Sequence, residues 1–268
     1  MFKLRHEEQT YNLRKLIFQV HNDLKAGWAE EIYHQALFQL LQGQGIPACF
    51  KPRKSIFHRG VEVHTFEADL IVWDLIILEL KMMPQISSFA PSHYAQIIHY
   101  LKCWSKDLGL LVNFGPTKVQ IERIVWDEPT LDVYENYDAV KADFSATDRL
   151  YLRQVRKIIL GAAQEYGIGY PATMYRHILA IELEHNGLNC LPDVIVPARF
   201  GDRILAQHAT DHLLVAERYL MNVRSLYLRP PAYEFMRTKT YLNQLGLEFG
   251  LLLNFGKKQL QIYGVKAT

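Results

Sequence analysis

The sequence repeats its own motifs in order, and this repetition restricts the chain to folds that can occur twice in tandem. The heptapeptide GLLVNFG at residues 109–115 returns as GLLLNFG at residues 250–256. Three further pairs keep the same order: residues 27–33 with 169–175, Gly45 with Gly187, and Tyr100-Leu101 with Tyr241-Leu242. All four matches share an offset of about 141–143 residues, the pattern of an internal duplication. We therefore expect one domain over residues 1–127, an acidic linker over 128–148, and a second copy over 149–268.

Hydrophobic periodicity predicts the elements of the first copy. Apolar residues recur every three or four positions between residues 7 and 44, and Lys25-Ala26-Gly27 interrupts them, which predicts two helices. A hairpin turning at Arg59-Gly60 is expected next, followed by two strands within residues 66–81. A helix over 92–102 and strands over 108–114 and 118–126 complete the copy. This order predicts an α/β fold in which helices flank a central mixed sheet.

Three charged residues accompany the two strands expected within residues 66–81. Asp69 is expected near the start of the first strand, and Glu79 and Lys81 share one face of the second because side chains alternate with a period of two. Charged groups beside a strongly apolar run are costly to bury without a compensating partner. Carboxylate oxygens are ligands that Mg²⁺ prefers. We therefore expect a divalent metal at Asp69 and Glu79, with Lys81 beside it; the competing interpretation is a turn carboxylate and a surface ion pair.

Several blocks of the first copy resemble a known family. Residues 27–33 (GWAEEIY) match the G-x-x-E-x-x-Y motif of the GxxExxY family, and the E-L-K of residues 79–81 and the GLLVNFG heptapeptide follow in the family's order. Lys25-Ala26 replaces a more usual turn before the motif. The family resembles the PD-(D/E)xK nuclease superfamily. The resemblance implies two tandem αβββαβ domains, the second degenerate, and Mg²⁺- or Mn²⁺-dependent cleavage of phosphodiesters.

Within this resemblance, further residues of the first copy acquire roles at the metal. The backbone carbonyl of Leu80 would supply a third oxygen ligand, and Glu30 would complete the shell directly or through a water. Lys81 would orient or help to deprotonate the attacking water. Gln96, on the later helix, would position a ligand water or the scissile phosphate.

When the two copies are aligned, the second one lacks the acids of the first but keeps its apolar framework. His212 falls on Asp69, and the other replacements are Asn222 for Glu79, Arg224 for Lys81, Ala172 for Glu30 and Arg237 for Gln96. A shift of one residue would place Asp211 on Asp69 instead. His, Asn and Arg side chains do not form the oxygen cage that Mg²⁺ requires. We therefore predict that the second copy is metal-free and inactive.

Basic and aromatic residues near these motifs are candidates for contacts with nucleic acid. A basic loop and the two basic positions of the second copy could bind phosphate, although the loop could equally be a solvated edge. Two motif tyrosines could contact bases, but the second copy keeps both, as Tyr175 and Tyr241, which favours a packing role. The candidates are Lys51, Arg53, Lys54, Arg59, Tyr33, Tyr100, Arg224 and Arg237.

Composition sets limits on partner and compartment. The chain has 268 residues, a net charge of +2 and 22% charged residues, so a large basic surface is not expected. Three cysteines without CxxC spacing argue against a zinc site or a disulfide framework, and a reducing, cytoplasmic location is expected. No apolar run reaches the length of a membrane span, and the first residues lack the apolar core of a secretory signal.

These observations predict a metal-dependent nuclease whose first copy is catalytic. Nucleic acid is the expected partner, DNA rather than RNA, with Mg²⁺ or Mn²⁺ as cofactor. The second copy would serve as a structural or substrate-binding partner that pairs with the first within the chain, and a homo-oligomer is left open. The alternative is a non-catalytic module that binds nucleic acid or protein on a nuclease fold.

Overall fold

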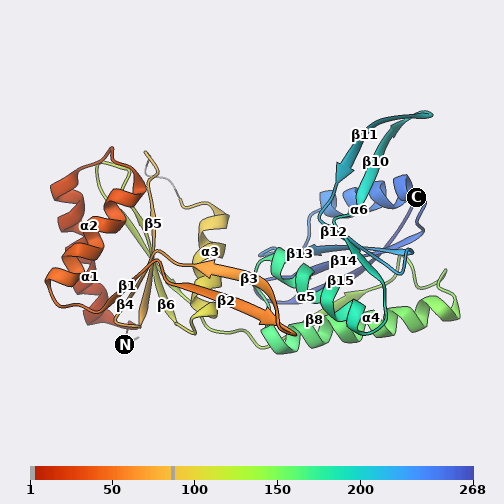
Figure 1. Ribbon diagram of the computed structural model, residues 1–268, viewed down its shortest axis with the longest axis horizontal. Helices are drawn as coiled ribbons and strands as arrows, with labels where there is room; N and C mark the ends of the chain where they lie inside the picture. The colour runs from red at the N-terminus through yellow and green to blue at the C-terminus, as the bar shows by residue number, and fades with distance from the viewer. Residues whose placement is uncertain (1–3, 86–87) are drawn as a thin grey trace. The chain divides into compact units, whose positions relative to one another are not determined.

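The computed structural model describes residues 4–85 and 88–268, and the chain divides into two compact units (Figure 1). One unit comprises the chain up to Ile56 together with Thr65–Glu128, and the other comprises Phe57–His64 together with Pro129–Thr268. Each unit has a mixed β-sheet flanked by helices. The expected α/β fold class is confirmed.

The first copy follows the predicted order of elements. Two long helices precede the sheet and a third is inserted before its last two strands: α1 (Glu7–Leu24), α2 (Glu30–Gly43) and α3 (Pro91–Cys103). The five-stranded sheet described for this copy has the order β1-β4-β5-β6-β7, formed by Ala48–Phe50, Leu70–Val72, Ile76–Lys81, Leu108–Asn113 and Gln120–Val125. Strands β5 and β6 are parallel, and the other neighbours are antiparallel.

A separate hairpin follows β1. Strands β2 (Arg53–His58) and β3 (Val61–Glu67) form a two-stranded sheet, as predicted. The chain reverses at Arg59 and Gly60, both of which have positive φ. Glycine adopts this conformation without steric cost, which explains why the turn occurs there.

The sheet of the first copy has a core on each face. Ile76, Leu78 and Leu80 alternate along β5 and pack with the apolar stripes of α1 and α2. On the opposite face, Leu111 of β6 packs with Ile97 of α3. The alternation follows from the two-residue period of a strand, and it leaves Glu79 and Lys81 on the face opposite Leu80.

The second copy repeats these elements in the same order. Its helices are α4 (Ala146–Tyr166), α5 (Ala172–His185) and α6 (Ala232–Leu245), and a hairpin is formed by β10 (Ile195–Phe200) and β11 (Arg203–Ala209). The six-stranded sheet described for this copy has the order β8-β15-β14-β13-β12-β9, formed by Val133–Asn136, Leu260–Lys266, Phe249–Phe255, Tyr219–Arg224, His212–Val215 and Cys190–Pro192. None of the helices in the described residues is long and apolar enough to cross a membrane.

The acidic segment 128–148, which we expected to be a linker, contributes a strand to the second unit. Its strand β8 pairs in parallel with β15 and extends the second sheet. Val140 and Phe144 are buried, and Phe144 packs edge-on against Phe249 at 4.8 Å between ring centroids. The apolar residues between the acids therefore anchor this segment to the second unit.

Strand register settles how the two copies align at the candidate site. The turn at residues 73–74, between β4 and β5, has positive φ at both positions, and the turn at residues 216–217 matches it. Counting back from these turns places His212 at the position of Asp69. Asp211 lies one residue earlier, so the one-residue shift considered from the sequence is wrong.

The repeated heptapeptide owes its asparagine to the fold. Asn113 Oδ1 accepts a hydrogen bond of 2.8 Å from the backbone N–H of Met83, which follows β5. In the second copy, Asn254 Oδ1 accepts one of 2.7 Å from the N–H of Leu226, which follows β13. Both asparagines are buried, and each satisfies backbone groups that leave the sheet. The heptapeptide is thus a structural element of both copies.

Candidate active site

Asp69 lies in the bend between β3 and β4, one residue before the strand in which we expected it. In the described residues, the β4–β5 ladder ends at the pair formed by Leu70 and Leu78. Beyond that point, the N–H of Leu80 donates to Asp69 Oδ2 at 2.7 Å. The N–H and C=O of one residue in an extended strand point to the same edge. The carbonyl of Leu80 is therefore directed toward the side of the sheet where Asp69 lies.

Glu79 is a buried carboxylate with only one of its oxygens occupied. It is 1% exposed, and Lys81, on the same face of β5, donates from Nζ to Glu79 Oε1. Glu79 Oε2 has no hydrogen-bond partner among the described residues. A buried polar atom without a partner is costly. The part of the sheet around Glu79, which we call the carboxylate corner, thus lacks a positive charge or a hydrogen-bond donor for Oε2.

The raised pKa of Glu79 indicates the same lack of positive charge. Burial raises the pKa of Glu79 to about 8, the Asp69 carboxylate adds to the increase, and Lys81 opposes it. Burial by itself lowers the pKa of Lys81, but attraction to Glu79 and to the carboxylates of Glu30 and Asp69 outweighs it, so that pKa is raised. Lys81 therefore remains a cation among carboxylates that it does not fully neutralise.

Glu30 reaches the same group from helix α2. It is the first residue of that helix, and its side chain is 41% exposed. Its negative charge raises the pKa values of both Glu79 and Lys81. Glu30 therefore lies close enough to Glu79 and Lys81 for its charge to act on both, and its role at a metal stays a prediction.

Gln96 is linked to the site through Tyr100. Its Nε2 donates to the Tyr100 hydroxyl at 2.9 Å, one helical turn further along α3. Tyr100 is buried, and its pKa is raised by burial and then by the charges of Glu79 and Asp69. Gln96 therefore contacts the phenol whose pKa the two carboxylates affect. Its direct contact with a ligand water or phosphate stays a prediction.

His34 was not singled out from the sequence, yet it faces the acids. It lies one turn after Glu30 on α2, and its side chain is only 4% exposed. Its Nε2 is 3.6 Å from Asp69 Oδ2 and 3.9 Å from Glu30 Oε1. The signal in the sequence was its spacing of four from Glu30, which puts both side chains on one face of a helix.

The donor set fits a divalent cation that prefers oxygen ligands. Asp69, Glu79 and Glu30 supply carboxylate oxygens, the Leu80 carbonyl points to the same edge, and Glu79 Oε2 lacks a partner in the described part of the chain. Within residues 4–85 and 88–268, no three His, Cys, Asp or Glu side chains are already gathered as a metal cage. The side chains would therefore have to close around an incoming ion.

Comparison with known proteins agrees with this geometry. A family model for the PD-(D/E)XK nuclease superfamily matches residues 7–124 and again residues 150–265. The chain belongs to the PD-(D/E)XK nuclease superfamily. Two separate matches, each covering one copy, confirm the tandem duplication that the sequence predicts. Members of this superfamily generally hydrolyse phosphodiester bonds.

Other comparisons add little. No curated protein matches the chain. Among solved structures, one titled "Crystal structure of SSO0001" is 25% identical, with a TM-score of 0.31, and the match covers 37% of this chain. It spans about half of the solved chain, 51%.

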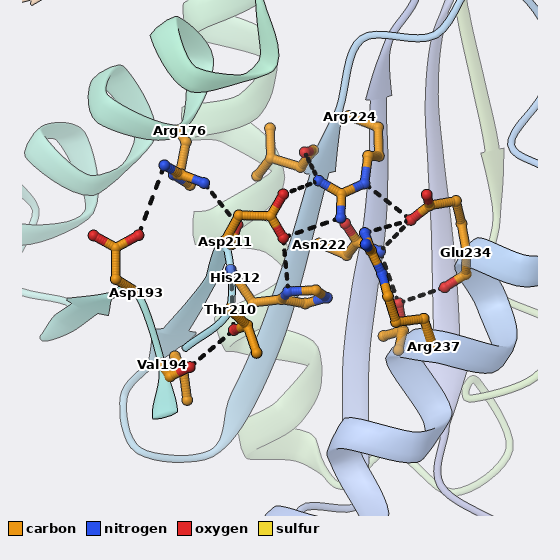
Figure 2. A network of polar contacts seen from close by, with 12 residues as sticks. Arg176, Asp193, Val194, Thr210, Asp211, His212, Asn222, Arg224, Glu234 and Arg237 are labelled. Carbon is orange, nitrogen blue, oxygen red and sulfur yellow. Dashed lines mark hydrogen bonds and ion pairs between the residues drawn. The ribbon is translucent and has the colours of Figure 1, made fainter. Parts of the chain in front are cut away.

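The second PD-(D/E)XK copy fills the equivalent corner with an ion-pair network (Figure 2). Arg224, at the position of Lys81, donates from Nη1 to Asp211 Oδ2 at 2.5 Å and from Nε to Glu234 Oε2 at 2.9 Å. Arg237 Nη2 donates to the same Glu234 oxygen at 2.7 Å. Burial lowers the pKa of His212, although Asp211 opposes that shift.

This network corrects the expectation that the second PD-(D/E)XK copy is locally basic. Its acids come from positions that the alignment does not match to acids of the first copy. Asp211 precedes the position of Asp69, and Glu234 lies on α6. Arg224 is buried and bound by both carboxylates, whereas Arg237 shares Glu234 with it and keeps its Nε without a hydrogen-bond partner in the described residues.

Each of the four basic residues at positions 51–59 already has a partner in the structure, and their contact with phosphate stays a prediction. Tyr33 is fully buried, stacks on Phe114 and donates to the carbonyl of Lys25 at 2.6 Å, which supports packing over contact with a base. The partners of the four basic residues are Glu31 for Lys51, Glu67 for Arg53, the carbonyl of Cys103 for Lys54 and Glu182 for Arg59.

Proposed function

We propose that the first copy is a Mg²⁺- or Mn²⁺-dependent phosphodiesterase that acts on nucleic acid, with DNA preferred over RNA. The observation that supports this most is the buried Glu79, whose Oε2 has no partner in the described residues and whose pKa is raised to about 8 by burial and by Asp69. A protein that buries such a carboxylate beside a second one gains stability when a cation neutralises both. The fold does not need this arrangement, because the second copy does without it.

Four groups of the first copy would hold the cation. Asp69 and Glu79 would supply carboxylate oxygens, the Leu80 carbonyl a neutral oxygen, and Glu30 a further oxygen directly or through a water. The Leu80 N–H fixes Asp69 by binding one of its oxygens at 2.7 Å. A bound divalent ion would supply an activated water and neutralise charge on the phosphate.

Lys81 and the pair formed by Gln96 and Tyr100 complete the proposed site. Lys81 donates to Glu79, and its ammonium is partly exposed, so it can orient a water and offset phosphate charge. Gln96 holds the Tyr100 hydroxyl at 2.9 Å, beside the charges of Glu79 and Asp69. This pair would limit how far water enters the carboxylate corner.

The second copy would act as a non-catalytic partner of the first. Arg224 carries a fixed positive charge where a cation site would otherwise form, and Asp211 and Glu234 already neutralise it. This arrangement supports a structural role over cleavage or phosphate binding in that copy.

Cleavage assays with matched variants test the proposal. Purified protein is incubated with single- and double-stranded DNA and RNA in Mg²⁺ or Mn²⁺. We expect Glu79→Gln to reduce cleavage at least about a hundredfold, roughly 3 kcal/mol of transition-state stabilisation, because a cation ligand is lost. Asn222→Ala, the same position in the second copy, should leave the rate near that of the wild type. If no substrate is cut, or if both variants cut equally, the proposal fails and a non-catalytic binding module takes its place.

A further inference from the structure

His34 is a buried polar side chain that no hydrogen bond accounts for. Its side chain is 4% exposed, and neither ring nitrogen has a hydrogen-bond partner among residues 4–85 and 88–268. Buried polar groups in folded proteins are hydrogen-bonded in the great majority of cases. An unpartnered imidazole therefore points to an interaction completed by something else at the site.

Both nitrogens of His34 face carboxylates just outside hydrogen-bonding distance. Nε2 lies 3.6 Å from Asp69 Oδ2 and 3.9 Å from Glu30 Oε1, and Nδ1 lies 3.6 Å from Glu31 Oε2. Hydrogen bonds between nitrogen and oxygen are typically about 2.7–3.2 Å long. A movement of less than about 1 Å would thus complete a bond between Nε2 and Asp69.

In the second copy, the residue at this helix position connects helix α5 to the segment that enters strand β12. Tyr33 corresponds to Tyr175, so His34 corresponds to Arg176. Arg176 Nη1 donates to the backbone carbonyl of Asp211 at 3.1 Å, as Figure 2 shows. In the copy without the metal ligands, this link ends on a backbone group. In the first copy, the residue at the same place faces the side chain of Asp69.

We propose that His34 is a positioning residue of the cation site, donating from Nε2 to the Asp69 carboxylate when the site closes. This inference rests on the proposed function of the first copy. The Asp69 oxygen nearest His34 is Oδ2, which already accepts the Leu80 N–H. Both donors therefore hold one oxygen and leave Oδ1 for the cation. Hydrogen bonds of this kind orient ligating carboxylates and tune the affinity of a metal site.

His34 would also set the position of helix α2 relative to the sheet. Glu30 begins the helix, and His34 lies one turn later on the same face. When His34 fixes Asp69, it also fixes the distance between Glu30 and the sheet edge. The affinity for the cation would therefore depend on a residue that does not itself bind the ion.

Calorimetric titration with Mn²⁺ tests this role without depending on activity. The full chain is compared with His34→Phe, which fills the volume without a donor, and His34→Gln, which restores one. His212→Phe is the matched control, because His212 is also fully buried and neither ring nitrogen makes a hydrogen bond in the described residues, although its Nδ1 lies 3.3 Å from Asp211 Oδ1. Urea unfolding in EDTA gives the metal-free stability of each variant.

We expect His34→Phe to weaken Mn²⁺ binding about tenfold or more and His34→Gln to stay within about threefold of the wild type. His212→Phe should not change the affinity, whatever its effect on stability. The inference is overturned if His34→Phe binds Mn²⁺ as the wild type does, or if both His34 variants weaken binding equally. A wild-type chain that binds no Mn²⁺ would overturn the proposed function itself, which is a separate outcome.

Discussion

At residue 79 the first copy buries a carboxylate where the second copy has a neutral amide. Asn222 Nδ2 donates to Thr238 Oγ1 at 3.0 Å and to Glu234 Oε2 at 3.1 Å, whereas its Oδ1 has no hydrogen-bond partner among the described residues. Glu79 has Lys81 on one oxygen and no partner on the other within the described chain. The same strand position is therefore compatible with a neutral residue, and the acid adds a demand for positive charge that the fold does not create.

The raised pKa of Glu79 predicts how the metal-free protein responds to pH. Its pKa is about 8 in the folded protein against 4.5 for an ordinary glutamate, so between these limits the folded state keeps a proton that the unfolded state has lost. The free energy of unfolding should therefore fall as pH rises through this window. Urea denaturation in EDTA between about pH 5 and pH 8 measures this slope. The Glu79→Gln variant should show a smaller decrease, and equal slopes would contradict the assignment.

Sequence reasoning identified Asp69, Glu79 and Lys81 but could not supply their partners. The period of a strand is enough to put Glu79 and Lys81 on one face. The bond from the Leu80 N–H to Asp69 depends on where β4 stops pairing, which no local pattern reports. His34 was passed over because a single histidine on an apolar helix resembles an ordinary core residue.

At the scale of elements, the hydrogen bonds of the repeated tyrosines explain why the last residue of the G-x-x-E-x-x-Y pattern is present in both copies. Tyr33 donates to the Lys25 carbonyl at 2.6 Å, and Tyr175 donates to the Gly167 carbonyl at 2.8 Å. Tyr175 also stacks on Phe255, with ring centroids 3.9 Å apart. Each tyrosine holds the turn between two helices, so it is retained where the acid of the motif is lost.

The glycine that opens the repeated heptapeptide allows close packing of helix and sheet. A Cβ added at Gly250 would lie 2.7 Å from the carbonyl oxygen of Leu220, on the neighbouring strand. Backbone cannot move aside as a side chain can, so we expect Gly250→Ala to destabilise the chain by about 1–3 kcal/mol. The measurement is urea unfolding monitored by circular dichroism.

Gly161, on helix α4, is the control for this substitution. A Cβ there would meet no described atom within 4 Å, and alanine favours helix over glycine by about 0.5–1 kcal/mol. Gly161→Ala should therefore be neutral or stabilising. Equal unfolding free energies for the two variants would refute the packing explanation.

The elements were predictable from periodicity and from turn residues, whereas the pairings between them were not. The two helices, the hairpin at Arg59-Gly60 and the buried strands follow from local patterns. Strand β8 was missed because its apolar residues are interspersed with acids, and its burial depends on pairing with β15, more than a hundred residues later in the sequence. The ion pairs that occupy the basic loop are also contacts between distant positions.

At the scale of the whole molecule, the duplication separates what the fold needs from what the chemistry needs. Both copies keep the buried asparagine, the stacked tyrosine and the close-packed glycine of their shared motifs. Only the first copy places two carboxylates and a lysine in the same corner, whereas the second has an arginine bound by Asp211 and Glu234. One chain thus carries a corner in which, among the described residues, a buried carboxylate oxygen has no partner, and a counterpart in which an arginine is bound by two carboxylates.

The number of Mn²⁺ sites per chain tests this account most directly. Calorimetric titration is performed on the wild type and on two variants at the same position of the two copies, Asp69→Asn and His212→Asn. We predict one site in the wild type, none after Asp69→Asn and one after His212→Asn, because the carboxylates in the corresponding corner of the second copy, Asp211 and Glu234, are already bound by Arg224. Two sites of equal strength, or a site that survives Asp69→Asn, would contradict the account.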